Sequence, residues 1–426
     1  MTSLRPTALA LWILGGWAGL APAPSLAQEA PAGAGNPPIL TEAEAVRMAL
    51  EKSRELAALE SEVRKQDALA AHVGGALQNP ELRLQDLSTN NAFPDENKQL
   101  QVGLRWRPPR LGELGLGRQQ EQVALFEKRL KASDQRQKLI AEVRKAYSEV
   151  AMLREVAALA RRKQGLEEGR VATLEKLVAL GQRQVFDQIK AEKRKIKARA
   201  EASQAQRRLV DAAGTLGALV GAQGSCTVAG GDPPEVAVTL ARLRDIALIH
   251  RQEFRLTGQR RELAEQRYRT ERYRLIPWFT FVEVAYHYES EKRDWLELLL
   301  GIELPLLNWN RGPIQATAID RERPGEPQAA TLERVERELR DAFSRYEKAL
   351  AEWQALKAEV GSFVARTSRV LEEAHKRSTV PADEVMEIEL SAIELEQMNV
   401  EARHDLQSAA IELCRAVGVE RTEELL

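Results

Sequence analysis

Residues Glu142-Val143-Arg144-Lys145-Ala146-Tyr147-Ser148 recur in related form as Glu338-Leu339-Arg340-Asp341-Ala342-Phe343-Ser344, 196 positions later (338 − 142). Asp187 and Asp383 are separated by the same offset (383 − 187). Self-similarity at a fixed offset is typical of internal repeats. The sequence therefore predicts an internal duplication, in which each unit carries two strands followed by a long helical hairpin.

Four segments alternate between apolar and polar residues, as do β-strands with one apolar and one polar face. In the second of them, apolar side chains occupy every even position from Leu100 to Trp106. In the third we expect Trp278 to share a face with Val284 and Tyr286. Polar residues such as Glu283 and Arg105 would lie on the opposite face, where simple solvation explains them. The segments are 81–87, 99–106, 278–288 and 296–304.

The same alternation fits either a soluble sandwich or a membrane barrel. Beyond residue 27 the chain has five tryptophans, and four of them flank the strands: Trp106, Trp278, Trp295 and Trp309. Aromatic residues at strand ends, with aliphatic residues between, are typical of the girdles of membrane barrels. A tilted membrane strand needs about 9–11 residues, which all but the first segment approach. We therefore favour the membrane barrel.

Long helices follow each strand pair. No proline occurs between Gly117 and Gly181, a stretch that would extend on the order of 96 Å as one helix. A second helix returns after Gly181. Ile140, Val143, Tyr147 and Val150 have heptad-like spacing, which predicts coiled-coil packing. The second arm, 312–418, should break near 321–328, because Pro324-Gly325-Glu326-Pro327 interrupts it.

Four strands cannot close into a barrel, and an open edge in lipid leaves backbone groups without hydrogen-bond partners. Two copies would give eight strands and a lumen filled by side chains. Three copies would give twelve strands and room for an aqueous channel. The predicted fold is therefore an α+β membrane protein: a homotrimer with a twelve-strand barrel continued by a coiled-coil tube of helices.

The first 27 residues predict export. Arg5, the apolar stretch 8–21 and Ser25-Leu26-Ala27 form a signal-peptide pattern; an uncleaved membrane anchor is the alternative. Thr41 and Glu44 form a capping-box pattern that opens a helix running to about Gly74. The predicted divisions are a signal peptide (1–27), a flexible leader (28–39), a first repeat (40–224), a linker (225–238), a second repeat (239–421) and a tail (422–426).

The composition gives no indication of catalysis. Lys and Arg total 62 against 63 Asp and Glu, so no global field favours nucleic acid. The five histidines are scattered, and the two cysteines, Cys226 and Cys414, are isolated. A disulfide between these cysteines stays open, because sequence does not give their separation. We expect no enzyme, no metal site and no cofactor.

Three stretches resemble one known family. They are Asn79-Pro80-Glu81-Leu82, Leu304-Pro305-Leu306-Leu307-Asn308-Trp309-Asn310-Arg311-Gly312, and Leu177-Val178-Ala179-Leu180-Gly181 followed by Val185-Phe186-Asp187. Their order and spacing over residues 40–421 resemble the TolC-type outer-membrane efflux proteins, or outer membrane factors. The resemblance implies a trimeric channel in the outer membrane of a Gram-negative bacterium, docked to a periplasmic adaptor protein and an inner-membrane pump. The Asn-Pro-Glu-Leu stretch leans toward branches that export metal cations.

Two features depart from the family pattern. Arg377 stands where the family usually places glycine in the second hairpin turn, and the 324–327 break interrupts the second arm. Both bear on how the hairpin tips pack.

The hairpin tips carry the candidate site residues. The resemblance places Asp187 and Asp383 at the narrow periplasmic mouth, where three copies of Asp383 would form a carboxylate ring that attracts cations. The alternative is a helix N-terminal acid that favours the helix dipole. Arg183, Arg377 and Glu387 are candidates for ion pairs that hold the tips closed.

The exposed turns are candidates for contact with the adaptor, through Gln182, Gln184, Ser378 and Thr379. A rival interpretation is that the chain is itself a periplasmic adaptor. Adaptors have one hairpin within a β-rich sequence, whereas this chain predicts two hairpins and four strands. A secreted enzyme is the third possibility, and it lacks a nucleophile–base pair or a ligand set.

Overall fold

The computed structural model describes residues 39–72, 78–86, 99–222, 227–228, 238–289, 294–307, 309–322, 325–377, 382–421 and 424. The chain divides into two units, residues 1–37 and 38–426, and all described residues lie in the second. The signal peptide and leader therefore lie outside the described residues. The chain is mostly helical with a small antiparallel sheet.

The elements of the two halves follow the same order, except that α7 and α8 stand in the second half where the first half has the single helix α3. In the first half they are β1 (Ile39–Leu40), α1 (Glu42–Lys52), α2 (Arg54–His72), β2 (Glu81–Asp86), β3 (Gln99–Trp106), α3 (Glu113–Ala179) and α4 (Val185–Val220). In the second half they are β4 (Thr227–Val228), α5 (Leu240–His250), α6 (Gln252–Tyr273), β5 (Trp278–Glu289), β6 (Trp295–Glu303), α7 (Arg311–Glu322), α8 (Gly325–Arg377) and α9 (Ala382–Val417).

The four predicted strands form one antiparallel sheet in the order β2-β3-β5-β6. Its register aligns Leu82, Leu104, Val284 and Leu298 in one row across the sheet. The strands therefore combine the two halves of the chain, since β3 and β5 pair with each other. A separate two-residue parallel pair joins β1 to β4.

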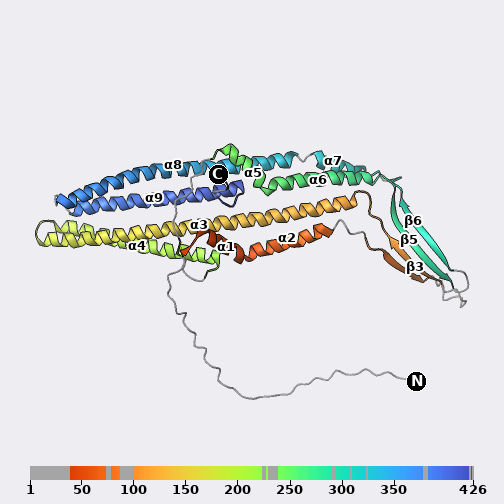
Figure 1. The fold of residues 1–426 in the computed structure, drawn as a ribbon, viewed down its shortest axis with the longest axis horizontal. Coiled ribbons are helices and arrows are strands. Elements are labelled where there is room, and N and C mark those ends of the chain that lie inside the picture. Colours follow the sequence, from red (N-terminus) through yellow and green to blue (C-terminus); the bar gives the residue numbers. More distant parts are fainter. Residues whose placement is uncertain are drawn as a thin grey trace, which may run out of the picture. The chain divides into compact units, whose positions relative to one another are not determined.

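The long helices pack side by side (Figure 1), with α3 between α4 and α9, and α9 between α3 and α8. Ile140, Val143, Tyr147 and Val150 of α3 are all buried, so the predicted heptad contacts are confirmed. In α8 every seventh residue from Leu339 through Tyr346, Trp353 and Val360 is buried as well. This 3.5-residue periodicity is that of a left-handed coiled coil.

The helix that precedes each strand pair is interrupted once. Thr41 and Glu44 form the predicted capping box at the start of α1. The sequence predicted one helix to about Gly74, but the extended backbone of Ser53 (ψ 108°) separates α1 from α2. Arg251 (ψ 119°) separates α5 from α6 in the same way. No proline or glycine marks either break in the sequence.

In the second arm α7 ends at Glu322 and α8 begins at Gly325. The middle of the predicted break, residues 323 and 324, lies outside the described residues, and its end is wrong because residues 325–328 are helical. Pro327 belongs to the first turn of α8. A missing N–H costs nothing there, because first-turn N–H groups have no intrahelical partner.

Candidate functional site

The sheet exposes its apolar face. Large apolar side chains alternate along all four strands, and the register places them on the same side. Burying such side chains usually drives folding, and a monomeric soluble protein rarely exposes a large contiguous apolar patch. This face therefore fits an apolar environment. Its exposed residues are Leu82, Leu84, Leu100, Leu104, Val284, Tyr286, Tyr288, Leu296, Leu298, Leu300 and Ile302.

The opposite face carries charges that pair with one another. Glu283 is only 3% exposed, and its Oε2 lies 2.6 Å from Arg105 Nη2 and 3.6 Å from Arg83 Nη1. Arg105 also lies over the ring of Phe281, 4.1 Å from its centroid. The sheet thus brings together three charges that the sequence placed on its polar face. Because both arginines converge on one carboxylate, the cluster carries a net positive charge.

A glycine makes room for this cluster. Gly103 lies beside Glu283, and a Cβ at this position would stand 2.9 Å from Glu283 Oε1. Nearer the other end of β5, His287 Nε2 lies 2.7 Å from Glu297 Oε2 and the imidazole stacks on Trp295 with ring centroids 4.7 Å apart. The polar face is therefore a packed, charged surface, rather than a set of independently solvated side chains as the sequence suggested.

Three of the four predicted girdle tryptophans begin or end a strand: Trp106, Trp278 and Trp295. Trp309 lies just before α7 and is exposed. One expectation is wrong, because a register shift between Phe279 and Phe281 puts Trp278 opposite Glu303, on the polar face. A bulge adds one residue and so reverses the alternation. Trp295 also lies on the polar face, where it pairs with His287.

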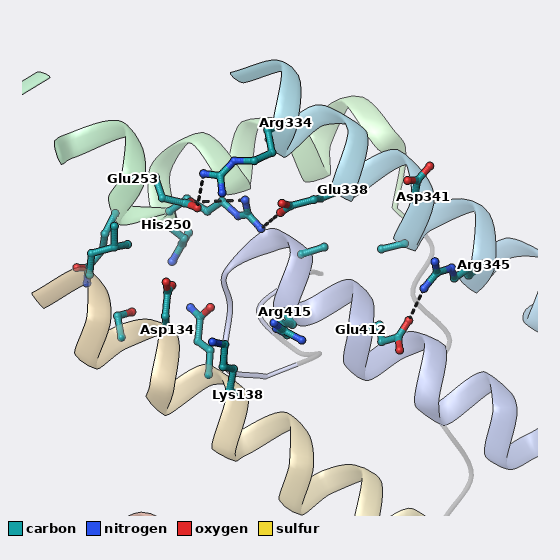
Figure 2. A pocket seen from close by; sticks show the side chains of 17 residues that line it. Asp134, Lys138, His250, Glu253, Arg334, Glu338, Asp341, Arg345, Glu412 and Arg415 are labelled. Atoms are coloured by element: carbon teal, nitrogen blue, oxygen red, sulfur yellow. Dashed lines mark hydrogen bonds and ion pairs between the residues drawn. The ribbon is translucent and has the colours of Figure 1, made fainter. Parts of the chain in front are cut away.

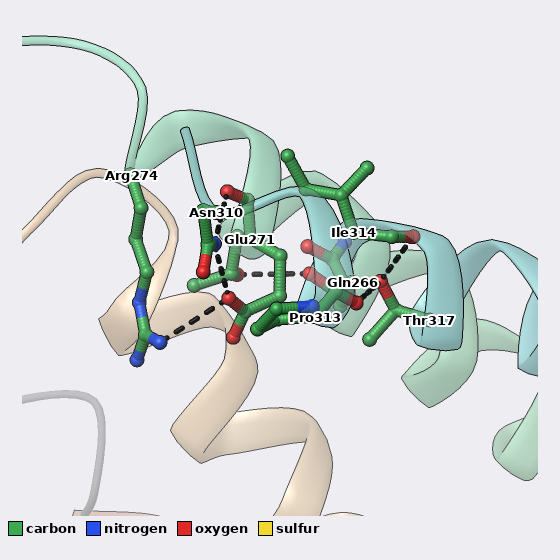
Figure 3. A network of polar contacts seen from close by, with 8 residues as sticks. Gln266, Glu271, Arg274, Asn310, Pro313, Ile314 and Thr317 are labelled. Carbon is green, nitrogen blue, oxygen red and sulfur yellow. Dashed lines mark hydrogen bonds and ion pairs between the residues drawn. The ribbon is translucent and has the colours of Figure 1, made fainter. Parts of the chain in front are cut away.

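The exit from β6 into α7 is fixed by one asparagine (Figure 3). Asn310 has a left-handed backbone (φ 48°), a conformation that asparagine tolerates better than most residues. Its Nδ2 donates hydrogen bonds to Glu271 O at 3.1 Å and Glu271 Oε2 at 2.7 Å, and the same carboxylate pairs with Arg274. The Asn-Arg-Gly stretch therefore joins the start of α7 to the end of α6. Sequence reasoning did not identify Glu271.

The first hairpin tip, the turn between α3 and α4, exposes both polar and large apolar side chains. Gly181 turns the chain with φ 73°, and α4 begins at Val185 without a side-chain cap. Gln182, Arg183 and Gln184 are exposed, as predicted for a contact surface. Leu180 and the first residues of α4 expose large apolar groups, among them Phe186 at 72%. Asp187 is half-buried in the first turn of α4.

The second tip is described only in part. Asp383 lies in the first turn of α9 and Arg377 ends α8, but their side chains lie outside the described residues, as do Ser378 and Thr379. Glu387 pairs with Arg170 Nη2 of α3 at 3.2 Å and with Arg194 Nη1 of α4 at 4.0 Å. Glu387 therefore links the two hairpins of one chain through Arg170 and Arg194, which were not among the gate candidates.

The two hairpins have opposite charge where they meet. Lys145, Lys163 and Arg170 of α3 lie 2.8, 3.1 and 3.2 Å from carboxylates of α9. The hydrogen bond and charge of Lys145 lower the pKa of Glu412. Burial opposes the charge of Lys163, but its bonds to Glu394 and Glu201 outweigh burial and raise its pKa. A reversed pair joins Arg403 of α9 to Glu155.

A pocket of about 470 Å³ lies where the α5–α6 break meets α3, α8 and α9 (Figure 2). Its charged groups largely pair among themselves: Arg334 with Glu253 at 3.0 Å, Arg251 with Glu338 at 2.8 Å, and Arg345 with Glu412 at 3.1 Å. Pairing of this kind ties the elements of the second half together. We therefore interpret the pocket as part of the packing between these helices, with a structural role.

Within the described ranges, no three His, Cys, Asp or Glu side chains are grouped so that they could hold a metal ion. In the same part of the chain, none of the helices combines the length and apolar character needed to cross a membrane. Cys414 is buried, and Cys226 lies outside the described residues, so the disulfide that the sequence left open is not tested.

No family model and no curated protein matches this chain. Its fold is similar to several solved structures of outer-membrane channels. CusC, described for transmembrane channel formation, matches with a TM-score of 0.69 at 16% identity, covering 89% of this chain and 92% of CusC. The Vibrio cholerae outer membrane protein VceC matches at 0.65 and 17%, covering 89% and 96%. The Neisseria gonorrhoeae MtrE outer membrane channel matches at 0.67 and 17%, covering 89% of each chain. The chain shares the fold of these proteins along most of its length.

Proposed function

We propose that this protein is an outer-membrane channel of a tripartite efflux system, acting as a passive conduit. The observation that carries the proposal is the sheet, whose apolar face is exposed while its polar face is packed with paired charges. In a water-soluble protein the apolar face would be covered, whereas in a membrane barrel it contacts lipid and the polar face lines the lumen. The shared fold with outer-membrane channels supports this reading. The protein would lie in the outer membrane of a Gram-negative bacterium.

The free sheet edges support a homotrimer. Strands β2 and β6 end the sheet order β2-β3-β5-β6, so each has one side without a ladder partner in the described part of this chain. Unpaired backbone groups are costly in lipid. Pairing β6 of one copy with β2 of the next would satisfy them, and three copies would complete twelve strands. The two predicted repeats, residues 40–224 and 239–421, would then together form one chain's share of the channel wall.

The helix hairpins would extend this channel into the periplasm. The exposed apolar groups at Leu180 and Phe186 support the turn 182–184 as a contact surface for a periplasmic adaptor, itself bound to an inner-membrane pump. Ser378 and Thr379 would contribute the equivalent contact of the second tip. Trp106, which ends β3 on the apolar face, would lie near a membrane interface.

The tips would also set ion selectivity. Asp187 and Asp383 both lie in the first turn of a helix, and three copies of Asp383 would form an acidic ring. Metal cations are the substrates this ring would favour. The Asp383→Ala variant should lower cation selectivity in single-channel recordings, and unchanged selectivity would remove Asp383 from the proposal.

Conductance tests the function itself. Protein extracted from the outer membrane is added to planar lipid bilayers, and discrete conductance steps are the expected result. A preparation that inserts no conducting unit, although correctly folded by circular dichroism, contradicts the channel.

A further inference from the structure

The two long hairpins of one chain, α3–α4 and α8–α9, have separate apolar cores. One buried apolar cluster combines residues of α1, α3 and α4, and another combines residues of α5, α8 and α9. Among the described residues, none belongs to both clusters. The line along which α3 meets α9, here called the seam, is bridged by ion pairs such as Lys163 with Glu394. Ion pairs near a surface contribute little stability, so the hairpins can separate along the seam more readily than either can unfold.

One buried position at the seam carries a charge. Glu167 follows Ala146 and Leu153 and precedes Leu174 at multiples of seven residues, so it occupies a core position in the heptad pattern of α3. Glu167 is only 4% exposed, and its Oε2 has no hydrogen-bond partner in the part of the chain that the structure describes. A buried carboxylate without a partner is destabilising. Glu167 therefore weakens the packing of the helices at this level.

Acids of α9 occupy both cations that lie beside Glu167 on its own helix. Lys163, four residues before it, lies 3.1 Å from Glu394. Arg170, three residues after it, lies 3.2 Å from Glu387. Residues three or four apart are neighbours on a helix surface. Glu167 is thus within reach of two cations, each of which is paired across the seam.

The residue opposite Glu167 on α9 is apolar. Leu390 lies between Glu387 and Glu394 with the same spacing that Glu167 has between their two partners on α3. Because α3 and α9 are antiparallel here, this matching spacing places Leu390 across the seam from Glu167. Leu390 is 8% exposed. The seam therefore supplies no charge that could compensate Glu167.

Arg170 has a free donor close to this carboxylate. Its side chain is 11% exposed, and its Nη1 is buried without a hydrogen-bond partner among the described residues, whereas Nη2 contacts Glu387. A buried cation that loses its partner is strongly destabilising. If Glu387 moves away from α3, Arg170 needs another acceptor. Glu167 can supply one without any change in the backbone of α3.

We propose that Glu167 is the alternative acceptor for Arg170, and that exchange of Arg170 from Glu387 to Glu167 lets α9 separate from α3. In the joined state described here, Arg170 pairs with Glu387 and Glu167 is unpaired. In the separated state Arg170 pairs with Glu167 within α3, while Glu387, whose side chain is already 60% exposed, is hydrated. Each state satisfies Arg170, which keeps the two close in free energy. The inference rests on the proposed channel for its biological meaning, since separation of the hairpins would widen the periplasmic end.

Thiol labelling measures how often the seam separates. Leu390→Cys, in full-length protein whose own cysteines are replaced by alanine, is buried in the joined state and reacts with a maleimide when α9 moves away. When opening and closing are fast, the labelling rate follows the population of the open form. Glu167→Gln should slow labelling roughly tenfold, which is the scale of one hydrogen bond to a charged group. Glu387→Gln should accelerate labelling by a similar factor.

The double variant distinguishes an exchange from two independent effects. Glu167→Gln combined with Glu387→Gln should label at close to the unmodified rate, because Arg170 then lacks an acidic partner in both states. Glu175→Gln is the matched control, since Glu175 is an exposed acid of the same helix, and it should leave the rate unchanged. If Glu167→Gln labels like this control, or the double variant labels as fast as Glu387→Gln alone, the exchange is overturned.

Two further measurements keep the exchange separate from folding and from the function. If Glu167→Gln does not fold by circular dichroism, Glu167→Asp, which withdraws the carboxylate by one methylene, should also slow labelling; an unchanged rate contradicts the exchange. In planar bilayers Glu167→Gln should lower the open fraction of single channels. An unmodified chain that never conducts contradicts the proposed channel and leaves labelling to decide the exchange. A conducting chain whose labelling is insensitive to Glu167 overturns the exchange alone.

Discussion

Replacing Leu298 by arginine tests whether the apolar face of the sheet contacts lipid. Leu298 lies in β6, in the row that also contains Leu82, Leu104 and Val284. All four side chains are exposed, and Leu298 is 64% exposed. The substitution therefore removes little protein packing, and its effect reports mainly on the medium that surrounds the sheet.

The expected cost follows from that medium. An arginine on the lipid face of a barrel lowers the free energy of unfolding by about 2–4 kcal/mol near the bilayer midplane. At about 1.4 kcal/mol per factor of ten, this is roughly a 30- to 700-fold fall in the folding equilibrium constant. An arginine at an exposed site in water usually changes stability by less than about 0.5 kcal/mol. Ile249 of α5 is the matched control, because it is also 64% exposed but lies on a helix.

The assay is urea unfolding of protein inserted into lipid vesicles, followed by tryptophan fluorescence. The Leu298→Arg variant should unfold at clearly lower urea than the unmodified protein, whereas the Ile249→Arg variant should match it. If the two variants behave alike, the sheet does not face lipid, and the membrane interpretation of its apolar face is refuted.

Three further predictions concern packing and charge. Glu283→Gln removes the carboxylate that Arg83 and Arg105 contact. Leaving Arg105 without this partner should lower the free energy of unfolding by about 3–5 kcal/mol, so the protein inserted into vesicles should unfold at lower urea. An unchanged urea midpoint would contradict the pairing. Trp353→Ala empties a buried heptad position of α8 and should lower the free energy of unfolding by about 3–5 kcal/mol. The loss is measured as a lower melting temperature of the helical circular dichroism signal. If the melting temperature falls no more than it does for an alanine substitution at an exposed position, Trp353 lies outside the core. Burial lowers the pKa of His404, which lies 2.8 Å from Ser148 Oγ. The unfolded state therefore binds the proton first, and stability should fall as pH drops below about 6.5. His404→Gln should flatten this slope between pH 7 and 5, and an equal slope in both proteins would exclude His404 as its source.

Periodicity predicted the elements because each kind of secondary structure repeats its side chains at its own interval. The alternation across 99–106 and 278–288 places the strands to within about a residue of their observed bounds. The heptad spacing from Ile140 to Val150 identifies residues that are buried between helices. Both signals are local, so a single sequence carries them.

Other features depend on contacts between distant segments. The bulge at Phe279–Phe281 turns Trp278 to the polar face, and no residue in that stretch marks the shift. The pairing of Glu387 with Arg170 and Arg194 joins residues about 200 positions apart. The charge difference between the hairpins was a usable signal, since acidic residues greatly outnumber basic ones in α9. Its use required knowing that α3 and α9 are neighbours.

The location and the oligomeric mass of the mature chain test the proposed channel most directly. The membranes of expressing cells are separated, and the fraction that contains the protein is extracted with detergent. The molar mass of the extracted protein is then measured by light scattering. A trimer in the outer membrane fraction is the predicted result. A monomer in the soluble periplasmic fraction would contradict the channel and favour a periplasmic adaptor.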